Sequence, residues 1–292
     1  MQGTGTKEAF AGLGEEYARL ETSDIVIVPA PFDKTTTYCH GTDRGPKALI
    51  EASRNMELYD IETAFEVYQK GIFTNPAIKA EDSLELLEKL YQEVYSLLQQ
   101  EKFVVTLGGE HAISLAPIRA HAQHFGPISV LQLDAHSDLI SAYEGNPYSH
   151  ASIMARVLEL EQIESLVAVG VRSMCSEEVP SLSSTKTFFA HDLFHNDLWM
   201  RQAVSELSEN VYITFDLDVF DSSVMPATGT PEPGGLFWHQ VMPFLHLVAK
   251  QRNIIGFDVV ELCPIPNIAA PDFLAAKLVY KLLSYIFKQR ER

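Results

Sequence analysis

The segment ISVLQLDAHSD, residues 128–138, joins a short apolar run directly to three side chains that bind metals well. Asp134, His136 and Asp138 stand at alternate positions, and alternate residues of an extended strand share one face. The pattern therefore predicts a buried strand whose end carries two carboxylates and an imidazole that converge. A lone motif of this kind can also be a polar strand end satisfied by hydrogen bonds, so the other strands must be compared with it.

Similar short runs recur along the chain and alternate with longer segments of helical period. We expect strands over residues 24–30, 103–109, 128–135, 166–171, 211–219 and 254–262. Helical periodicity is clearest over residues 83–100, 152–160, 237–252 and 271–289. Alternating strands and helices predict an α/β fold with a mainly parallel central sheet covered on both faces. With no repeat or linker in the sequence, we expect residues 1–292 to form a single domain.

The composition limits the classes of partner. A net charge of −17 argues against a nucleic-acid surface and is compatible with a cationic ligand. The N-terminus lacks the apolar core of a signal peptide, and no run approaches the roughly 20 apolar residues of a membrane span. The three cysteines, Cys39, Cys175 and Cys263, are too widely spaced for a disulfide framework or a zinc pattern. We therefore expect a cytoplasmic protein with no nucleic-acid and no membrane partner.

Two other predicted strands also end in metal-binding side chains. His111 follows the strand 103–109, and Asp216 and Asp218 close the strand 211–219. Parallel α/β sheets bind ligands outside the carboxyl ends of their strands. The three ends together supply four carboxylates, two imidazoles and no thiolate, a set that suits Mn²⁺ better than structural zinc. Six ligands suit two divalent cations that share carboxylates, and four negative charges balance two such ions.

These motifs resemble those of the ureohydrolases, the family that includes arginase and agmatinase. The resemblance rests on LGGEHAIS at 107–114, LQLDAHSD at 131–138 and TFDLDVFDSSVMPATGTPEPGG at 214–235, in that order. GTDRGPKALIEAS at 41–53 and GFDVVELCP at 256–264 resemble an early segment and the final strand of the same family. A single short motif is weak evidence, whereas an ordered set spread over most of the chain is strong.

The resemblance implies a three-layer α/β/α fold, two Mn²⁺ per subunit and a homo-oligomer, either a trimer or a hexamer. By family analogy, Asp134 and Asp216 bridge the two ions. His111 and Asp138 then complete one site, and His136 and Asp218 complete the other. A hydroxide held by both ions attacks the guanidinium carbon, and the tetrahedral intermediate collapses to urea and an amine. Asp138 would also orient that hydroxide.

Two further residues take roles from the same comparison. His150, in NPYSHASI, aligns with the histidine that carries protons to the leaving amine and contacts the substrate. Outside such a motif, a histidine at a loop-to-helix junction is more often a cap or a surface residue. Glu261, in DVVELCP, aligns with the carboxylate that holds the guanidinium, and a buried acid needs such a partner. For Asp258 we expect a structural hydrogen bond.

The loops favour agmatine, which would give putrescine and urea in polyamine synthesis. Ile140, Ser173 and Cys175 replace polar or acidic residues with which arginases grip the amino-acid end of arginine. The segment 138–157 resembles the agmatinase branch instead. Glu144, with Tyr143 or Tyr148 beside it, is the candidate for binding the distal ammonium of a cationic guanidino substrate. Glu110, Ser222 and Ala227 also depart from common family residues, and we expect them to alter only loop detail.

Four alternatives stay open at this point. The longer substrate N1-aminopropylagmatine differs from agmatine only in its tail, which the pocket mouth would select. A guanidino-acid hydrolase acting on guanidinobutyrate would need a cation near the pocket, for which Arg172 is the obvious candidate. A one-metal deacetylase would leave His111 and Asp138 without a task. An inactive scaffold subunit would be expected to lose a ligand, and this chain keeps all six.

Overall fold

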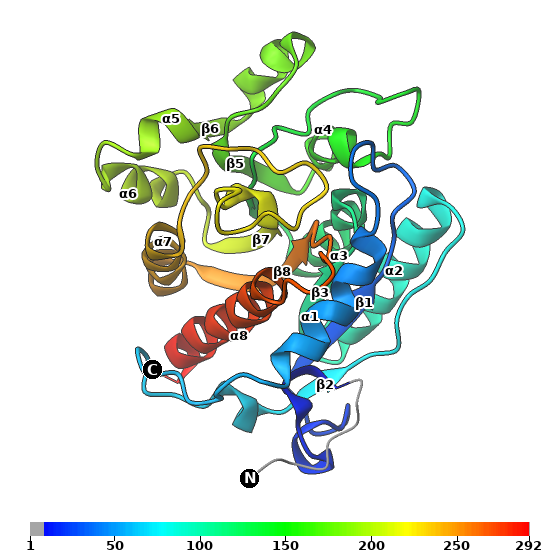
Figure 1. Cartoon of the computed structure of the whole chain (residues 1–292), viewed down its shortest axis with the longest axis vertical. Coiled ribbons are helices and arrows are strands. Elements are labelled where there is room, and N and C mark those ends of the chain that lie inside the picture. Colours follow the sequence, from blue (N-terminus) through cyan, green and yellow to red (C-terminus); the bar gives the residue numbers. More distant parts are fainter. Residues whose placement is uncertain (1–8, 292) are drawn as a thin grey trace.

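Eight apolar segments pair into one sheet in which every strand runs parallel to its neighbours (Figure 1). The computed structural model describes residues 9–291. The first eight residues of the N-terminal segment, for which we predicted no signal peptide, therefore lie outside the described residues. The strand order is β2-β1-β3-β8-β7-β4-β5-β6. The strands are β1 (Ile25–Ala30), β2 (Ile72–Thr74), β3 (Phe103–Gly108), β4 (Ile128–Leu133), β5 (Ile163–Val171), β6 (Lys186–Phe189), β7 (Asn210–Asp216) and β8 (Asn253–Val260).

Helices cover both faces of the sheet, because successive side chains of each strand point to opposite sides. Ile25 and Ile27 of β1 belong to the core that contains the apolar faces of α1, α6, α7 and α8. Val26 and Val28 belong to the core formed with α2, α3 and α4. The predicted three-layer α/β/α architecture is therefore confirmed. The helices are α1 (Gly45–Ser53), α2 (Ser83–Gln99), α3 (Leu115–Phe125), α4 (Ile153–Val157), α5 (Ala190–Leu193), α6 (Leu198–Ser205), α7 (Trp238–Gln251) and α8 (Ala270–Arg290).

The helix α2 illustrates how local sequence sets these elements. Asp82 caps its first turn by accepting a hydrogen bond from the Glu85 backbone N–H at 2.9 Å. Leu86, Leu90 and Val94 then recur at intervals of four residues and bury one face. The helix α8 is longer and buried over most of its surface, yet within residues 9–291 no helix is long and apolar enough to cross a membrane.

The sequence located the six central strands but not the two at the edges. The strands β2 and β6 span only three and four residues, and each pairs with one neighbour. The helices α1, α3, α5 and α6 were also not predicted, and α4 is shorter than the expected 152–160. The ends of β4 and β7 differ as well, since these strands stop at Leu133 and Asp216. The single-domain expectation stays a prediction.

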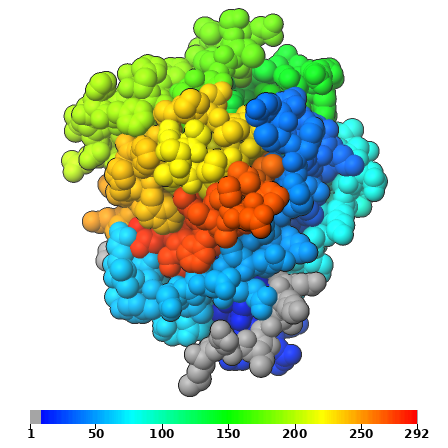
Figure 2. All heavy atoms as spheres, in the orientation of Figure 1, coloured from blue at the N-terminus to red at the C-terminus, as the bar shows by residue number. Residues whose placement is uncertain are grey.

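Three loops at the carboxyl ends of the strands lie side by side on one face of the molecule. Figure 2 shows them as neighbouring blue, yellow and orange surfaces. The Cys39 N–H donates to Gly229 O at 3.1 Å, and the Cys263 N–H donates to Ala227 O at 2.8 Å. These bonds join the loop after β1 to those after β7 and β8, and together the loops cover the carboxyl end of the sheet.

Candidate active site and metal centre

The six side chains predicted to bind metals converge beyond the carboxyl ends of β3, β4 and β7. His111 opens a 3-10 turn after β3, Asp134 directly follows β4, and Asp216 is the last residue of β7. Five of the six are buried, and His136 is half-buried, with 24% of its side chain exposed. Convergence therefore follows from the topology, which places β4, β7, β8 and β3 next to one another.

The expected strand alternation is not what brings these ligands together. Residues 134–138 lie beyond the end of β4, and Asp218 lies in a 3-10 turn. Asp134 Oδ1 accepts a hydrogen bond from the His136 N–H at 2.6 Å, and Asp216 Oδ1 accepts one from the Asp218 N–H at 2.9 Å. Each first aspartate thus folds the chain in an aspartate turn that aims the second ligand back at the site. Asp138 needs the left-handed backbone, with φ +53°.

The ligand atoms fall into two groups that share one carboxylate. One group is His111, Asp134 and Asp216, and the other is Asp134, His136 and Asp218, with all ligand atoms of a group within 4.8 Å of one another. Asp138 joins the first group, since its Oδ2 lies 2.9 Å from His111 Nδ1. Both groups contain Asp134, a residue predicted to lie between the two ions. The bridging role of Asp216 stays a prediction.

Crowding of buried carboxylates makes the site unfavourable without added positive charge. Burial, reinforced by the charge of Asp134, raises the pKa of Asp138 to about 7. Burial and the neighbouring charges of Asp218 and Asp134 raise the pKa of Asp216 well above its usual value. Two divalent cations would neutralise these groups at the distances that the ligand atoms already keep.

The orientation of His111 fits a metal ion. Thr214 Oγ1 donates to Asp258 Oδ1 at 2.8 Å, so it accepts from His111 Nε2–H, also at 2.8 Å. The other ring nitrogen, Nδ1, then presents a lone pair to the carboxylates of Asp134 and Asp138, and no donor among residues 9–291 satisfies it. Burial lowers the pKa of His111, but these two carboxylates raise it well above its usual range, so a proton and a cation compete for Nδ1.

Asp258 has the structural role expected of it. Besides Thr214, it accepts a hydrogen bond from the Tyr212 hydroxyl at 2.9 Å, and burial raises its pKa to about 6. A histidine ligand whose second nitrogen is fixed in this way holds its ring in one orientation. Thr214 and Tyr212 were not predicted, because they lie inside an apolar strand.

The loop that carries Asp138 is clamped by an acidic residue that sequence reasoning missed. Glu178, which is buried, accepts hydrogen bonds from the Leu139 N–H at 2.9 Å, the Cys175 N–H at 2.6 Å and the Ser137 hydroxyl. The segment CSEE at 175–178 has the spacing of a capping box, but cysteine stands where serine or threonine is usual, so the sequence signal was weak.

A narrow cavity of about 20 Å³ leads to the ligands, and His150 and Glu261 line it together with all of them except Asp134. Glu261 Oε1 accepts from the His111 N–H at 2.7 Å, and Glu261 has φ +67°. Burial, with the charge of Glu110, raises the pKa of Glu261 well above its usual value, so a cationic partner would stabilise its charged form. Burial, with the charges of His136 and His111, lowers the pKa of His150 to about 4. The remaining lining is neutral and comes from Thr36, Thr37, Gly229 and Thr230.

Comparison with known proteins agrees with this arrangement, as residues 23–284 match the Arginase family. The chain belongs to the arginase family. It is 34% identical over 275 residues to the N(1)-aminopropylagmatine ureohydrolase of Synechocystis sp., covering 89% of this chain and 88% of that protein. It is 32% identical over 269 residues to the agmatinase of Pyrococcus horikoshii, covering 90% and 92%. The agmatine ureohydrolase of Thermoplasma volcanium superposes with a TM-score of 0.88 at 27% identity, covering 98% and 96%.

Not every residue predicted to touch substrate lies at the cavity of this arginase-family chain. Glu144 is exposed on the turn between Tyr143 and Asn146 and does not line the cavity. The ring of Tyr143 instead packs edge-on against His150, with centroids 5.7 Å apart. Tyr148 is half-buried against the core around α2, α3 and α4. The structure therefore brings His150 and Glu261 to the ligands and leaves Glu144 outside.

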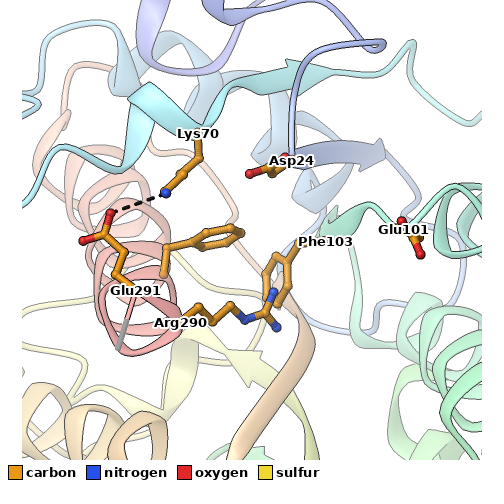
Figure 3. A pocket seen from close by; sticks show the side chains of 7 residues that line it. Asp24, Lys70, Glu101, Phe103, Arg290 and Glu291 are labelled. Carbon is orange, nitrogen blue, oxygen red and sulfur yellow. Dashed lines mark ion pairs between the residues drawn. The ribbon is translucent and has the colours of Figure 1, made fainter.

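A second cavity, of about 320 Å³, lies at the opposite end of the sheet, where β1 and β3 begin. Figure 3 shows Lys70 paired with Glu291, at 3.4 Å, and Arg290 beside the Phe103 ring, 4.8 Å from its centroid. These charges have partners within the cavity wall, and none of the family motifs reaches it. It has the features of a structural contact around the end of α8.

Proposed function

We propose that the protein hydrolyses agmatine to putrescine and urea with two bound Mn²⁺, as a step of polyamine synthesis. The observation that carries the proposal is the convergence of six candidate ligands, five of which line one cavity together with His150 and Glu261. Relatives at 32% and 34% identity are named agmatinase and N(1)-aminopropylagmatine ureohydrolase, which supports a hydrolase of guanidino carbon–nitrogen bonds.

The metals would be held by the two ligand groups described above. One ion would bind His111, Asp134, Asp138 and Asp216, and the other Asp134, His136 and Asp218. By family resemblance, Asp216 would also bind the second ion. Carboxylates and imidazoles without thiolates favour Mn²⁺, although other divalent ions accept such ligands. When bound, the ions supply a water of lowered pKa, which a resonance-stabilised guanidinium needs near neutral pH.

The residues of the chain then divide the remaining tasks. Glu261 binds the guanidinium, since its buried carboxylate lacks a cationic partner in the described part of the chain. Asp138, on its strained turn above His111, orients the nucleophile. His150, unprotonated near neutral pH, gives a proton to the leaving amine after taking one from the reacting centre.

The lack of a Lys or Arg side chain in the cavity lining, among the described residues, argues against an anionic substrate tail. Arg172, the candidate for binding a carboxylate, donates instead to the backbone carbonyls of Asp218 at 2.6 Å and Glu232 at 2.9 Å. Guanidinobutyrate and arginine are therefore disfavoured, whereas N1-aminopropylagmatine remains the second candidate because relatives bear that name.

We further propose a cytoplasmic homo-oligomer, a trimer or a hexamer. The free thiols of Cys39, Cys175 and Cys263 support a reducing compartment, and the assembly rests on the family resemblance. Light scattering on the purified chain measures the subunit number. A monomer would reject the assembly without touching the chemistry.

The test of the function is urea release by the Mn²⁺-loaded protein from four substrates side by side. Agmatine should give the highest kcat/KM, above N1-aminopropylagmatine, L-arginine and guanidinobutyrate. Preference for the aminopropyl compound would move the protein one step in polyamine synthesis and keep the mechanism. Absence of urea from all four, with two metals bound, would favour the inactive scaffold.

A further inference from the structure

The loop between β1 and α1 sends a threonine hydroxyl to the histidine that lines the cavity. Thr35 Oγ1 lies 3.2 Å from His150 Nδ1 and accepts a hydrogen bond from the His150 backbone N–H at 3.1 Å. The same hydroxyl donates to Glu110 Oε1 at 2.6 Å. Glu110 is fully buried and directly precedes His111 at the end of β3. Three segments far apart in the sequence therefore meet at one hydroxyl group.

The capacity of this hydroxyl decides which ring nitrogen of His150 carries the proton. A threonine hydroxyl has one hydrogen and two acceptor positions. The hydrogen goes to the carboxylate of Glu110, and the backbone N–H of His150, which can only donate, takes one acceptor position. The other position accepts from Nδ1–H. The second nitrogen, Nε2, is left with its lone pair on the far side of the ring from Thr35.

Glu110 holds the loop through its backbone as well. Its Oε2 accepts hydrogen bonds from the N–H groups of Lys34, Thr35 and Thr36 at 2.8, 2.7 and 3.2 Å. A carboxylate surrounded by donors in this way acts as an acceptor toward the Thr35 hydroxyl too. The residue that stood out in the sequence as glutamate in place of the common aspartate thus has a task, because its longer side chain reaches this loop.

We infer that Thr35 is a positioning residue, which with Glu110 holds His150 as the Nδ1–H tautomer and leaves Nε2 to exchange a proton with the substrate. Thr35 does not line the cavity, whereas His150 does, so we expect the effect of Thr35 on turnover to pass through His150. The kinetic part of the inference rests on the proposed function. The tautomer is a property of the chain and is measured without turnover.

The kinetic test compares Thr35→Val, Thr35→Ser and Thr42→Val in the Mn²⁺-loaded enzyme with agmatine. Thr35→Val should lower kcat about 10- to 100-fold, a part of what a histidine contributes, with KM changed less than about threefold. Thr35→Ser keeps the hydroxyl and should restore kcat to within about threefold of the wild type. Thr42→Val is the matched control, because the buried Thr42 hydroxyl has no hydrogen-bond partner among the described residues. Unchanged kcat in Thr35→Val, or no rescue by serine, would overturn the inference.

The tautomer test uses nitrogen-15 NMR of histidine-labelled protein, loaded with diamagnetic Zn²⁺ because Mn²⁺ broadens the signals. The His150 signals are assigned from their loss in His150→Asn. The wild type and Thr35→Ser should show the Nδ1–H pattern, and Thr35→Val should lose it. An Nε2–H pattern in the wild type, or the wild-type pattern in Thr35→Val, would reject the role of Thr35. If the wild type releases no urea, the proposed function fails while this measurement still decides the inference.

Discussion

Two histidines at the site are each held by a threonine hydroxyl that donates to a carboxylate, but different parts of the fold build the two hydrogen-bond networks. In the first, which we call the metal-site network, Thr214 and Asp258 are register partners on β7 and β8, and His111 follows β3. All three residues are buried. Strand pairing therefore sets this geometry before any ion binds.

The second, which we call the cavity network, runs from Glu110 through Thr35 to His150. Only Glu110 is buried, and the other two residues lie in loops that are half-buried. The difference fits the roles proposed for the two histidines. A metal ligand needs one fixed lone pair, which the sheet provides for His111. A proton carrier must face the substrate cavity, and His150 lines it.

The comparison is tested most severely by removing each histidine. His111→Asn should lose at least one metal and lower urea release more than about a thousandfold, because the water of lowered pKa is lost with the ion. His150→Asn should keep both metals and lower kcat by roughly 100- to 10,000-fold, the range for one acid–base group. Elemental analysis of the purified variants, beside the urea assay, separates the two. Full metal content in His111→Asn would contradict its assignment.

The metal-site network can also be broken at Thr214, its middle residue. Thr214→Val keeps the shape of the side chain but leaves Asp258 and His111 Nε2–H without their partner in a buried site. Metal affinity should fall about 10- to 100-fold, the usual cost of losing such a partner. The free energy of unfolding should fall by about 1–3 kcal/mol for the unsatisfied groups. Metal titration and urea denaturation measure the two effects, and Thr214→Ser should restore both. Unchanged affinity in the valine variant would mean that His111 needs no orienting group.

A third histidine, His121, shows how burial shifts a pKa where the described residues form no such hydrogen-bond network. His121 Nδ1 donates to Pro117 O at 2.7 Å, while its buried Nε2 has no partner in the described part of the protein. Burial lowers its pKa to about 4. The unfolded chain binds this proton at higher pH than the folded chain does, so stability is present above pH 6.5 and is lost as pH falls toward 4.

At pH 5 the loss from this one group should be about 2 kcal/mol relative to pH 7.5. The measurement is the unfolding free energy at both pH values for the wild type and for His121→Gln, which removes the titration. The carboxylates of the site are common to both proteins, so the difference between them isolates His121. Equal acid sensitivity in the two proteins would show that His121 binds its proton at the same pH in the folded chain as in the unfolded chain.

The candidate metal ligands could be selected from the sequence, while the groups that orient them could not. Asp134, His136 and Asp138 stand together in one motif beside an apolar run, and this is a local signal. Thr35 and Glu110 are 75 residues apart, and the Thr214–Asp258 contact spans 44, so no local pattern joins them. Turn geometry was also missed. Two of the ligands come into place through aspartate turns rather than strand alternation, because β4 and β7 end sooner than their apolar pattern suggested.

The smallest expected effect concerns how far the cavity network extends. Glu144 was predicted to bind the distal ammonium, yet it lies exposed on a turn, where water screens charge. An exposed pair of charges at 4 Å is worth about 1 kcal/mol, so Glu144→Gln should raise KM for agmatine by less than about fivefold and leave kcat unchanged. Glu261→Gln, measured in the same assay, should lower kcat/KM far more, because the buried Glu261 carboxylate is the group proposed to bind the guanidinium. A tenfold or larger rise in KM for Glu144→Gln would mean that the cavity network includes this turn. The loop would then have to close over the substrate tail.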